Sequence, residues 1–179
     1  SKDVRSDLYQ LNKNCELADR HLQSWIYWQF KYYNDITTCT PEGESLYDND
    51  GNVVTDKLLV LSRTYPQLVA GSIISYQFHS ELVKFSLSFY SLTYLPKLVT
   101  SRVSSIYFNR ELFYPHGVIL SLTTSSGETI SSNQIDVTCG KLSDNNMLYL
   151  TQNELFDSDI YVVVELTACS LVNIKSCTC

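Results

Sequence analysis

The chain has 179 residues, of which 44% are hydrophobic and 18% charged, so it can bury a substantial core and is too apolar to be disordered. Nineteen acidic residues against 13 basic ones give a net charge of -6, and no Lys/Arg cluster is present, which argues against nucleic-acid binding. The apolar runs are short, as at 161–164, so no transmembrane segment is predicted.

The first predicted element is a helix over residues 3–22. Its apolar residues recur at alternating spacings of four and three, which places them on one face of a helix, and Asp3 is a suitable N-cap. The residues of this stripe are Val4, Leu8, Leu11, Cys15, Ala18 and Leu22.

An aromatic segment follows at residues 24–30, with the sequence Ser-Trp-Ile-Tyr-Trp-Gln-Phe. Apolar residues occupy nearly every position without helical periodicity, which predicts a strand buried on both faces, as in the parallel sheets of α/β folds. One helix–strand–helix unit cannot cover both faces of such a strand. Either the segment packs on the rest of the chain in an unusual way, or it completes a sheet whose other strands lie upstream.

Residues 32–52 are predicted to be the longest loop, with a strong turn signal at 48–51, Asp-Asn-Asp-Gly. A second helix is predicted over 56–69. Thr55 or Asp56 would cap its start and Gly71 would follow its end, while Pro66 could shorten it.

From residue 72 onward, short segments rich in β-branched and aromatic residues alternate with turn residues. Within one of them, Phe85 and Leu87 alternate with Lys84 and Ser86, so the first pair is expected in the core and the second in solvent. The predicted strands are 72–80, 83–91, 103–109, 117–124, 129–138, 147–151, 160–168 and 170–176. Strands without intervening helices indicate an antiparallel β-sandwich.

The six cysteines show no spacing typical of a metal site, and no metal or cofactor is predicted. The closely spaced pair near the end of the chain indicates disulfides and an oxidising compartment. We expect most of Cys139, Cys169, Cys177 and Cys179 to be oxidised, and their connectivity stays open. Cys15 and Cys39 are also candidates, although Cys15 lies on the helical stripe and could simply be buried.

Acidic pairs and histidines are scattered without a nucleophile motif or an apolar setting that would raise a carboxyl pKa. We interpret these residues as solvated or core side chains, so no catalytic residue is predicted in this chain. They are Glu42 and Glu44, Asp48 and Asp50, Asp157 and Asp159, His79 and His116.

The string at residues 22–31, Leu-Gln-Ser-Trp-Ile-Tyr-Trp-Gln-Phe-Lys, resembles the last helix-to-strand passage of the endoglycoceramidases of glycoside hydrolase family 5. Residues 35–38, 61–67, 106–109 and 114–117 are similar to the same group. These secreted or lysosomal enzymes cleave the bond between an oligosaccharide and ceramide, by a retaining mechanism that uses two Glu residues.

The resemblance implies the end of a (β/α)₈ TIM barrel over residues 1–70, followed by an antiparallel β-sandwich over 71–179. Residues 3–22 would be the seventh barrel helix, 24–30 the eighth strand and 56–69 the eighth helix. The first seven strands and both catalytic Glu would then lie on an upstream chain of the same precursor, which would be a partner of this chain.

The resemblance also implies a substrate site. Trp28 matches the family tryptophan at the end of the eighth strand, which stacks beneath the sugar next to the cleaved bond. Gln29, Lys31 and Asp35 would follow at the rim of this site, and the ligand would be a glycolipid or an oligosaccharide.

Three functions stay open. In the first, the chain is the C-terminal chain of a split glycosidase and is not catalytic alone. In the second, it is a non-catalytic secreted protein on the same scaffold, with a structural or recognition role. In the third, it is an autonomous sandwich that binds carbohydrate or lipid. Residues 1–5 contain neither a start Met nor the hydrophobic run of a signal peptide, so we expect a processed chain. The expected location is secreted or extracellular, with the lysosome as an alternative.

Overall fold

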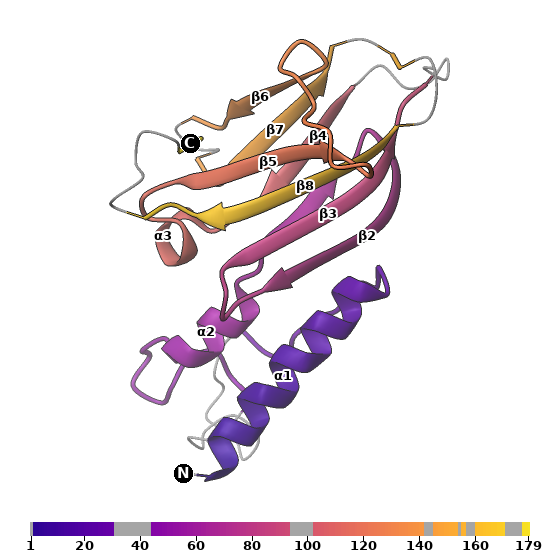
Figure 1. Cartoon of the computed structure of the whole chain (residues 1–179). Helices are drawn as coiled ribbons and strands as arrows, with labels where there is room; N and C mark the ends of the chain where they lie inside the picture. The colour runs from indigo at the N-terminus through magenta and orange to yellow at the C-terminus, as the bar shows by residue number, and fades with distance from the viewer. Residues whose placement is uncertain are drawn as a thin grey trace. The chain divides into compact units, whose positions relative to one another are not determined.

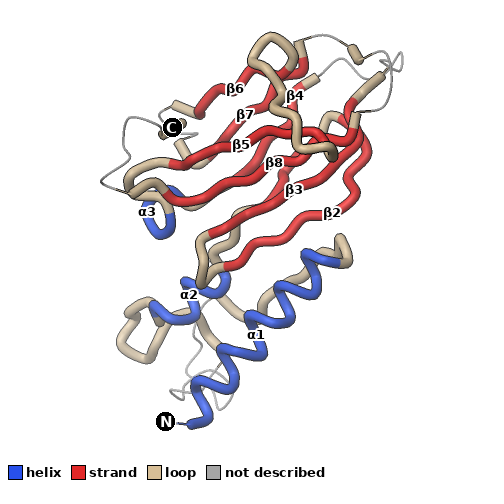
Figure 2. Tube along the Cα trace, viewed as in Figure 1, coloured by secondary structure: helices blue, strands red, loops and turns tan. Residues whose placement is uncertain are grey.

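The structure is a computed structural model that describes residues 2–30, 44–93, 102–141, 145–153, 155–156, 160–170 and 177–179, with backbone only for 2–6. The chain divides into two compact units, Ser1–Arg63 and Thr64–Cys179 (Figures 1 and 2). The second unit therefore starts before residue 71, where the sequence analysis placed the sandwich.

The first unit opens with helix α1, Lys2–Arg20, in agreement with the predicted helix. Asp3 lies inside the first turn and is not the N-cap. The most deeply buried side chains of α1 are Asn12, Cys15 and Asp19, whereas Leu22 of the predicted apolar stripe is exposed. Polar residues thus share the buried face with the stripe.

Residues 24–30 were predicted to be a strand, and in the described part of this unit they form none. A β-strand requires a neighbouring backbone to complete its ladder of hydrogen bonds. Among the described residues, its backbone partners are isolated: the N–H of Gln29 donates to the carbonyl of Glu44 at 3.3 Å, and the N–H of Leu46 donates to the carbonyl of Gln29 at 3.0 Å.

Helix α2 spans Thr55–Leu61 and ends well before the predicted boundary at residue 69. Its N-cap is Val54, so the prediction of Thr55 or Asp56 as cap was wrong. Pro66 disfavours helical backbone at the preceding residue, and Tyr65–Leu68 instead form strand β1. Gly71 begins β2, where a Cβ would lie 2.0 Å from the carbonyl oxygen of Tyr90.

The second unit is an antiparallel β-sandwich of two four-stranded sheets, as predicted, and its layers are visible in Figure 1. All pairs of neighbouring strands are antiparallel. One sheet has the order β1-β4-β7-β6, with β1 Tyr65–Leu68, β4 Val103–Tyr107, β7 Met147–Gln152 and β6 Ile135–Cys139. The other has the order β2-β3-β8-β5, with β2 Gly71–His79, β3 Lys84–Ser91, β8 Tyr161–Ala168 and β5 Val118–Thr124.

The sandwich differs from the prediction in three details. The strand predicted over 129–138 is shorter, because β6 begins at Ile135. Strand β1 had been assigned to a helix, and a short helix α3, Arg110–Phe113, was not anticipated. The side chain of Asn109 caps α3 by accepting the N–H of Leu112 at 3.1 Å. The predicted strand at 170–176 falls, beyond residue 170, outside the described residues.

The core of the sandwich follows the predicted alternation. Phe85 and Leu87 of β3 are fully buried, whereas Lys84 and Ser86 are not. Lys84 forms an ion pair of 2.7 Å with Glu165 of β8. Burial of each large apolar side chain stabilises a fold by about 1.5–3 kcal/mol, so this alternation is a main determinant of the sandwich.

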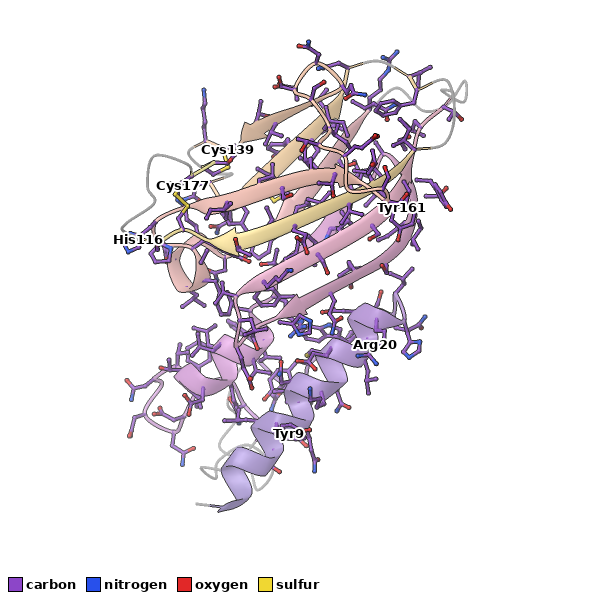
Figure 3. All side chains as sticks on the ribbon, viewed as in Figure 1. Tyr9, Arg20, His116, Cys139, Tyr161 and Cys177 are labelled. Carbon is purple, nitrogen blue, oxygen red and sulfur yellow. A yellow bond between two sulfur atoms is a disulfide. The ribbon has the colours of Figure 1, made fainter. Side chains whose placement is uncertain are left out.

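Two disulfides link the cysteines that the sequence analysis selected, Cys139 with Cys179 and Cys169 with Cys177 (Figure 3). Cys15 is a buried free cysteine, and burial raises the pKa of its thiol. Cys39 lies outside the described residues.

Tyr114 is fully buried, and its hydroxyl lies 3.1 Å from Oγ1 of Thr64. Burial raises the pKa of Tyr114 to about 12. The unfolded chain ionises near its ordinary pKa of about 10, so the unfolded state loses this proton first as the pH rises. The stability that the neutral Tyr114 contributes is therefore fully present below pH 10 and is lost as the pH rises toward 12.

We expect the stability of the wild type relative to Tyr114→Phe to fall by about 1.4 kcal/mol between pH 9 and pH 11. Urea unfolding of both proteins at the two pH values, followed by circular dichroism, measures this difference. The Phe variant keeps every other tyrosine, so it is the baseline against which the pH dependence of the wild type is measured. An unchanged difference would show that the phenol ionises equally easily in both states.

Candidate functional site

Three of the four most exposed large apolar side chains among the described residues of the first unit lie in residues 25–30, which we call the aromatic segment. Ile26 is 95% exposed, Trp28 69% and Phe30 60%. Folded domains rarely leave neighbouring large apolar side chains in water unless the surface contacts a ligand or another protein. The segment is therefore the candidate functional site.

A short hairpin at residues 46–54, closed by the antiparallel bridge between Tyr47 and Val53, holds this segment. Gln29 is buried and exchanges backbone hydrogen bonds with residues 44–46, and the hydroxyl of Tyr27 donates to the carbonyl of Glu44. The ring of Phe30 meets that of Tyr47 edge-on at 5.3 Å between centroids. The peptide bond between Trp28 and Gln29 is cis. The indole of Trp28 thus projects from a backbone that is anchored at the next residue.

The turn of this hairpin uses an acidic residue that the sequence analysis had considered for chemistry. Oδ1 of Asp48 accepts the N–H groups of Asp50 at 3.0 Å and Asn52 at 2.7 Å. These bonds hold the pKa of Asp48 below its ordinary value, because they stabilise the carboxylate. Asp48 therefore shapes the turn and does not have the raised pKa of a general acid.

The predicted site residues divide into two groups. Trp28 and Gln29 lie together in the aromatic segment, one exposed and one buried. Lys31 and Asp35 lie outside the described residues, as do Glu42, Asp157 and Asp159. Substrate contact by Trp28 stays a prediction.

Two of the histidines considered for chemistry lie in the described second unit. His116 is exposed and labelled in Figure 3, and His79 is half-buried in β2. Across the described ranges, no group of three His, Cys, Asp or Glu side chains could hold a metal ion.

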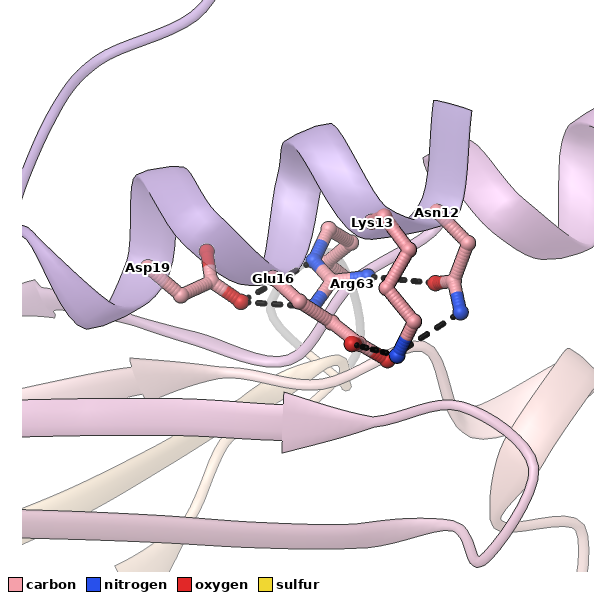
Figure 4. Close-up of polar contacts among 5 residues, drawn as sticks. All are labelled: Asn12, Lys13, Glu16, Asp19 and Arg63. Carbon is pink, nitrogen blue, oxygen red and sulfur yellow. Dashed lines mark hydrogen bonds and ion pairs between the residues drawn. The ribbon is translucent and has the colours of Figure 1, made fainter. Parts of the chain in front are cut away.

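A buried ion pair in the first unit was not anticipated. Nη2 of Arg63 lies 2.6 Å from Oδ2 of Asp19, and its Nε donates to the same oxygen at 3.1 Å (Figure 4). Nη1 of Arg63 donates to Asn12 at 3.4 Å. Both side chains of the ion pair are 3% exposed. One feature of the sequence could have indicated this pair: Asn12 and Asp19 are seven residues apart, on the helix face that carries Cys15.

Asn12, Asp19 and Arg63 are buried from solvent, so this polar cluster stabilises the fold and does not bind a ligand. Arg63 follows α2 in the chain, so its bonds to Asp19 and Asn12 fasten α1 to the segment that follows α2. A buried guanidinium needs such partners, because an unpaired buried charge is strongly destabilising.

A small cavity lies between the two sheets of the sandwich. It has a volume of about 10 Å³, which is room for one water molecule and far too little for a sugar ring. Its lining includes Arg102, Ser104 and Gln152. This cavity is not a saccharide site.

The two antiparallel sheets define a β-sandwich, and the family described as Glycoside hydrolase family 5 C-terminal domain matches residues 63–155. The chain belongs to this family and corresponds to a C-terminal, endoglycoceramidase-like portion of a family 5 protein, as the resemblance implied.

Two curated relatives support this assignment. The chain is 30% identical over 141 residues to an endoglycoceramidase from Cyanea nozakii, which covers 75% of this chain and 26% of the relative. It is 28% identical over 138 residues to an endoglycoceramidase from Hydra vulgaris, which covers 73% of this chain and 24% of the relative. The chain thus spans about a quarter of the length of these relatives.

Among solved structures, the fold is similar to sterylglucosidase 1 from Cryptococcus neoformans. The crystal structure with tris has a TM-score of 0.55 at 12% sequence identity and covers 94% of this chain and 24% of that chain. A second structure of the same protein, with hit 1, has a TM-score of 0.53 and 12% identity, and covers 94% of this chain and 25% of that chain. At this identity the likeness concerns the fold.

Within the described residues, none of the helices combines the length and the apolar character that crossing a membrane requires.

Proposed function

We propose that this chain is the C-terminal chain of an endoglycoceramidase-like glycosidase that acts on glycosphingolipids together with an upstream chain of the same precursor. The first unit would supply the last elements of a (β/α)₈ barrel, and the upstream chain would supply the other strands. Both catalytic Glu residues would lie on that chain, about 5–5.5 Å apart as a retaining mechanism requires.

The observation that carries this proposal is the exposure of the aromatic segment. Ile26, Trp28 and Phe30 are all more than half exposed, yet the backbone next to them is anchored by the hairpin. Covering one such side chain contributes about 1.5–3 kcal/mol, so a partner that buries the segment gains several kcal/mol. Strands of an upstream chain on either side of residues 24–30 would provide that cover.

Trp28 would supply the sugar contact. The flat apolar face of an indole suits the C–H face of a sugar ring, while the sugar hydroxyls remain free for polar partners. Active sites of such barrels lie at the C-terminal ends of the strands, and Trp28 would stand near that end if residues 24–30 became the eighth strand on pairing with the upstream chain. Gln29, Lys31 and Asp35 would line the rim.

The two disulfides support an oxidising compartment for this protein. We therefore place the proposed enzyme outside the cell or in the lysosome.

The proposed function is tested on the native protein, because the chain is not expected to be catalytic alone. Mass spectrometry without reduction shows whether an upstream chain accompanies it and whether that chain retains two Glu residues. Release of oligosaccharide from a fluorescent glycosylceramide measures the activity. A native protein that has its partner but lacks this activity would favour the structural or recognition function.

Replacement of Trp28 by alanine in the assembled enzyme is expected to lower kcat/KM on a glycosylceramide about 10- to 100-fold, or about 1.4–2.7 kcal/mol of transition-state binding. Tyr9→Ala is the matched control, because Tyr9 is an exposed aromatic residue on α1, outside the aromatic segment (Figure 3). Steady-state kinetics of both variants check this prediction. Equal kcat/KM for Trp28→Ala and the wild type would remove Trp28 from the site.

A further inference from the structure

Both residues that flank Trp28 bind the same backbone group. The hydroxyl of Tyr27 donates to the carbonyl oxygen of Glu44, and the N–H of Gln29 donates to the same oxygen at 3.3 Å. A carbonyl oxygen has two lone pairs and can accept both bonds. These two bonds, which we call the Glu44 clamp, therefore join the chain just before Trp28 to the chain just after it.

Burial alternates along the aromatic segment. Gln29 is buried and Tyr27 is half-buried, whereas Ile26, Trp28 and Phe30 are exposed. Neighbouring side chains of an extended backbone point to opposite sides, and this alternation follows that rule. The two residues of the clamp thus turn away from solvent while the indole faces it. A ligand can cover the indole without displacing Tyr27 or Gln29.

The residues that follow Glu44 are fixed as well. The N–H of Leu46 donates to the carbonyl of Gln29 at 3.0 Å, and Nζ of Lys57 donates to the carbonyl of Ser45 at 3.0 Å. Lys57 belongs to α2, so a helix supports the acceptor of the clamp. Groups tied to regular secondary structure are positioned more precisely than groups held by loops alone.

The hydroxyl of Tyr27 must keep its proton to act as a donor, because a carbonyl oxygen only accepts. Burial raises the pKa of Tyr27 above its ordinary value of about 10, and the charge of Glu44 raises it further. The donor is therefore protonated at neutral and acidic pH.

We propose that Tyr27 is a positioning residue for Trp28, because its bond to the carbonyl of Glu44 holds the indole in the orientation that contacts the sugar. The sugar contact rests on the proposed function, whereas the clamp is a property of this chain. A contact group that is held in place before binding loses less conformational entropy when the ligand arrives.

The first test measures the motion of Trp28 without substrate. The chain has two tryptophans, so Trp25→Phe leaves Trp28 as its only indole. In that background, Tyr27→Phe removes the hydroxyl and keeps the ring, and we expect the amplitude of the fast fluorescence anisotropy decay to at least about double. Glu44→Gln keeps the backbone carbonyl and is the matched control. An unchanged decay for Tyr27→Phe, or an equal increase for Glu44→Gln, would overturn the proposal.

The second test is a double-mutant cycle in the assembled enzyme. Tyr27→Phe is expected to lower kcat/KM on a glycosylceramide about three- to tenfold, the range of one lost hydrogen bond. In a Trp28→Ala background the same change should alter kcat/KM by less than about 1.5-fold, because Tyr27 acts through Trp28. Tyr9→Phe removes the same atom from an exposed tyrosine on α1 and should keep wild-type kinetics. Equal losses in both backgrounds would overturn the proposal, since a merely structural tyrosine gives additive effects.

The two tests separate this proposal from the proposed function. The anisotropy decay needs no substrate, so a negative result there counts against the clamp alone. A wild-type assembly without glycosidase activity counts against the proposed function, and the anisotropy decay still decides whether Tyr27 positions Trp28.

Discussion

Replacement of Arg63 by alanine is expected to lower the free energy of unfolding of the first unit by about 3–5 kcal/mol. Asp19 accepts two bonds from this guanidinium, and both side chains are only 3% exposed. Removing one partner leaves a buried carboxylate without its compensating charge. Denaturant dependence of hydrogen exchange in the α1 backbone measures the effect, because that helix carries Asp19.

Two variants make this test specific. Lys13→Ala removes another basic residue from an ion pair of 2.6 Å with Glu16, but Lys13 is 47% exposed, and such pairs contribute about 0.2–1 kcal/mol. The double variant Asp19→Leu/Arg63→Met removes both buried charges, and we expect it to be close to the wild type in stability. A loss below 1 kcal/mol for Arg63→Ala would be in the range of exposed ion pairs and would show that the pair of Arg63 and Asp19 is solvated.

Removal of the disulfide between Cys139 and Cys179, by replacement of both residues with serine, is expected to destabilise the sandwich by about 4 kcal/mol. The cysteines are 40 residues apart, and closing a loop of this length restricts the unfolded chain strongly. Urea unfolding followed by circular dichroism of the strands measures the change.

The second disulfide is the matched control. Cys169 and Cys177 are only 8 residues apart, and the same chain-entropy relation gives about 2.5 kcal/mol for that loop. The serine variant that lacks the bond between Cys139 and Cys179 should therefore be less stable than the one that lacks the bond between Cys169 and Cys177. Equal losses would show that loop entropy does not govern these crosslinks, and strain or contacts in the folded state would take its place.

Local patterns in the sequence determined the sandwich. The alternation of Phe85 and Leu87 with Lys84 and Ser86 recurs in the buried and outward faces of β3, because the side chains of a strand alternate with period two whatever it pairs with. The helical spacing of residues 3–22 predicted α1 for the same kind of reason, and the string around Trp28 identified the family.

Only the tertiary structure decided the features that depend on partners distant in the chain. Tyr65–Leu68 is a strand because β4 offers it a ladder, although the sequence predicted a helix over 56–69. Residues 24–30 form no strand because isolated backbone partners do not make a ladder. The same reason applies to side chains: the bond of Arg63 to Asp19 and the choice of Cys179 as partner of Cys139 join residues 44 and 40 positions apart. Periodicity within one segment carries no information about which distant residue the fold will bring to it.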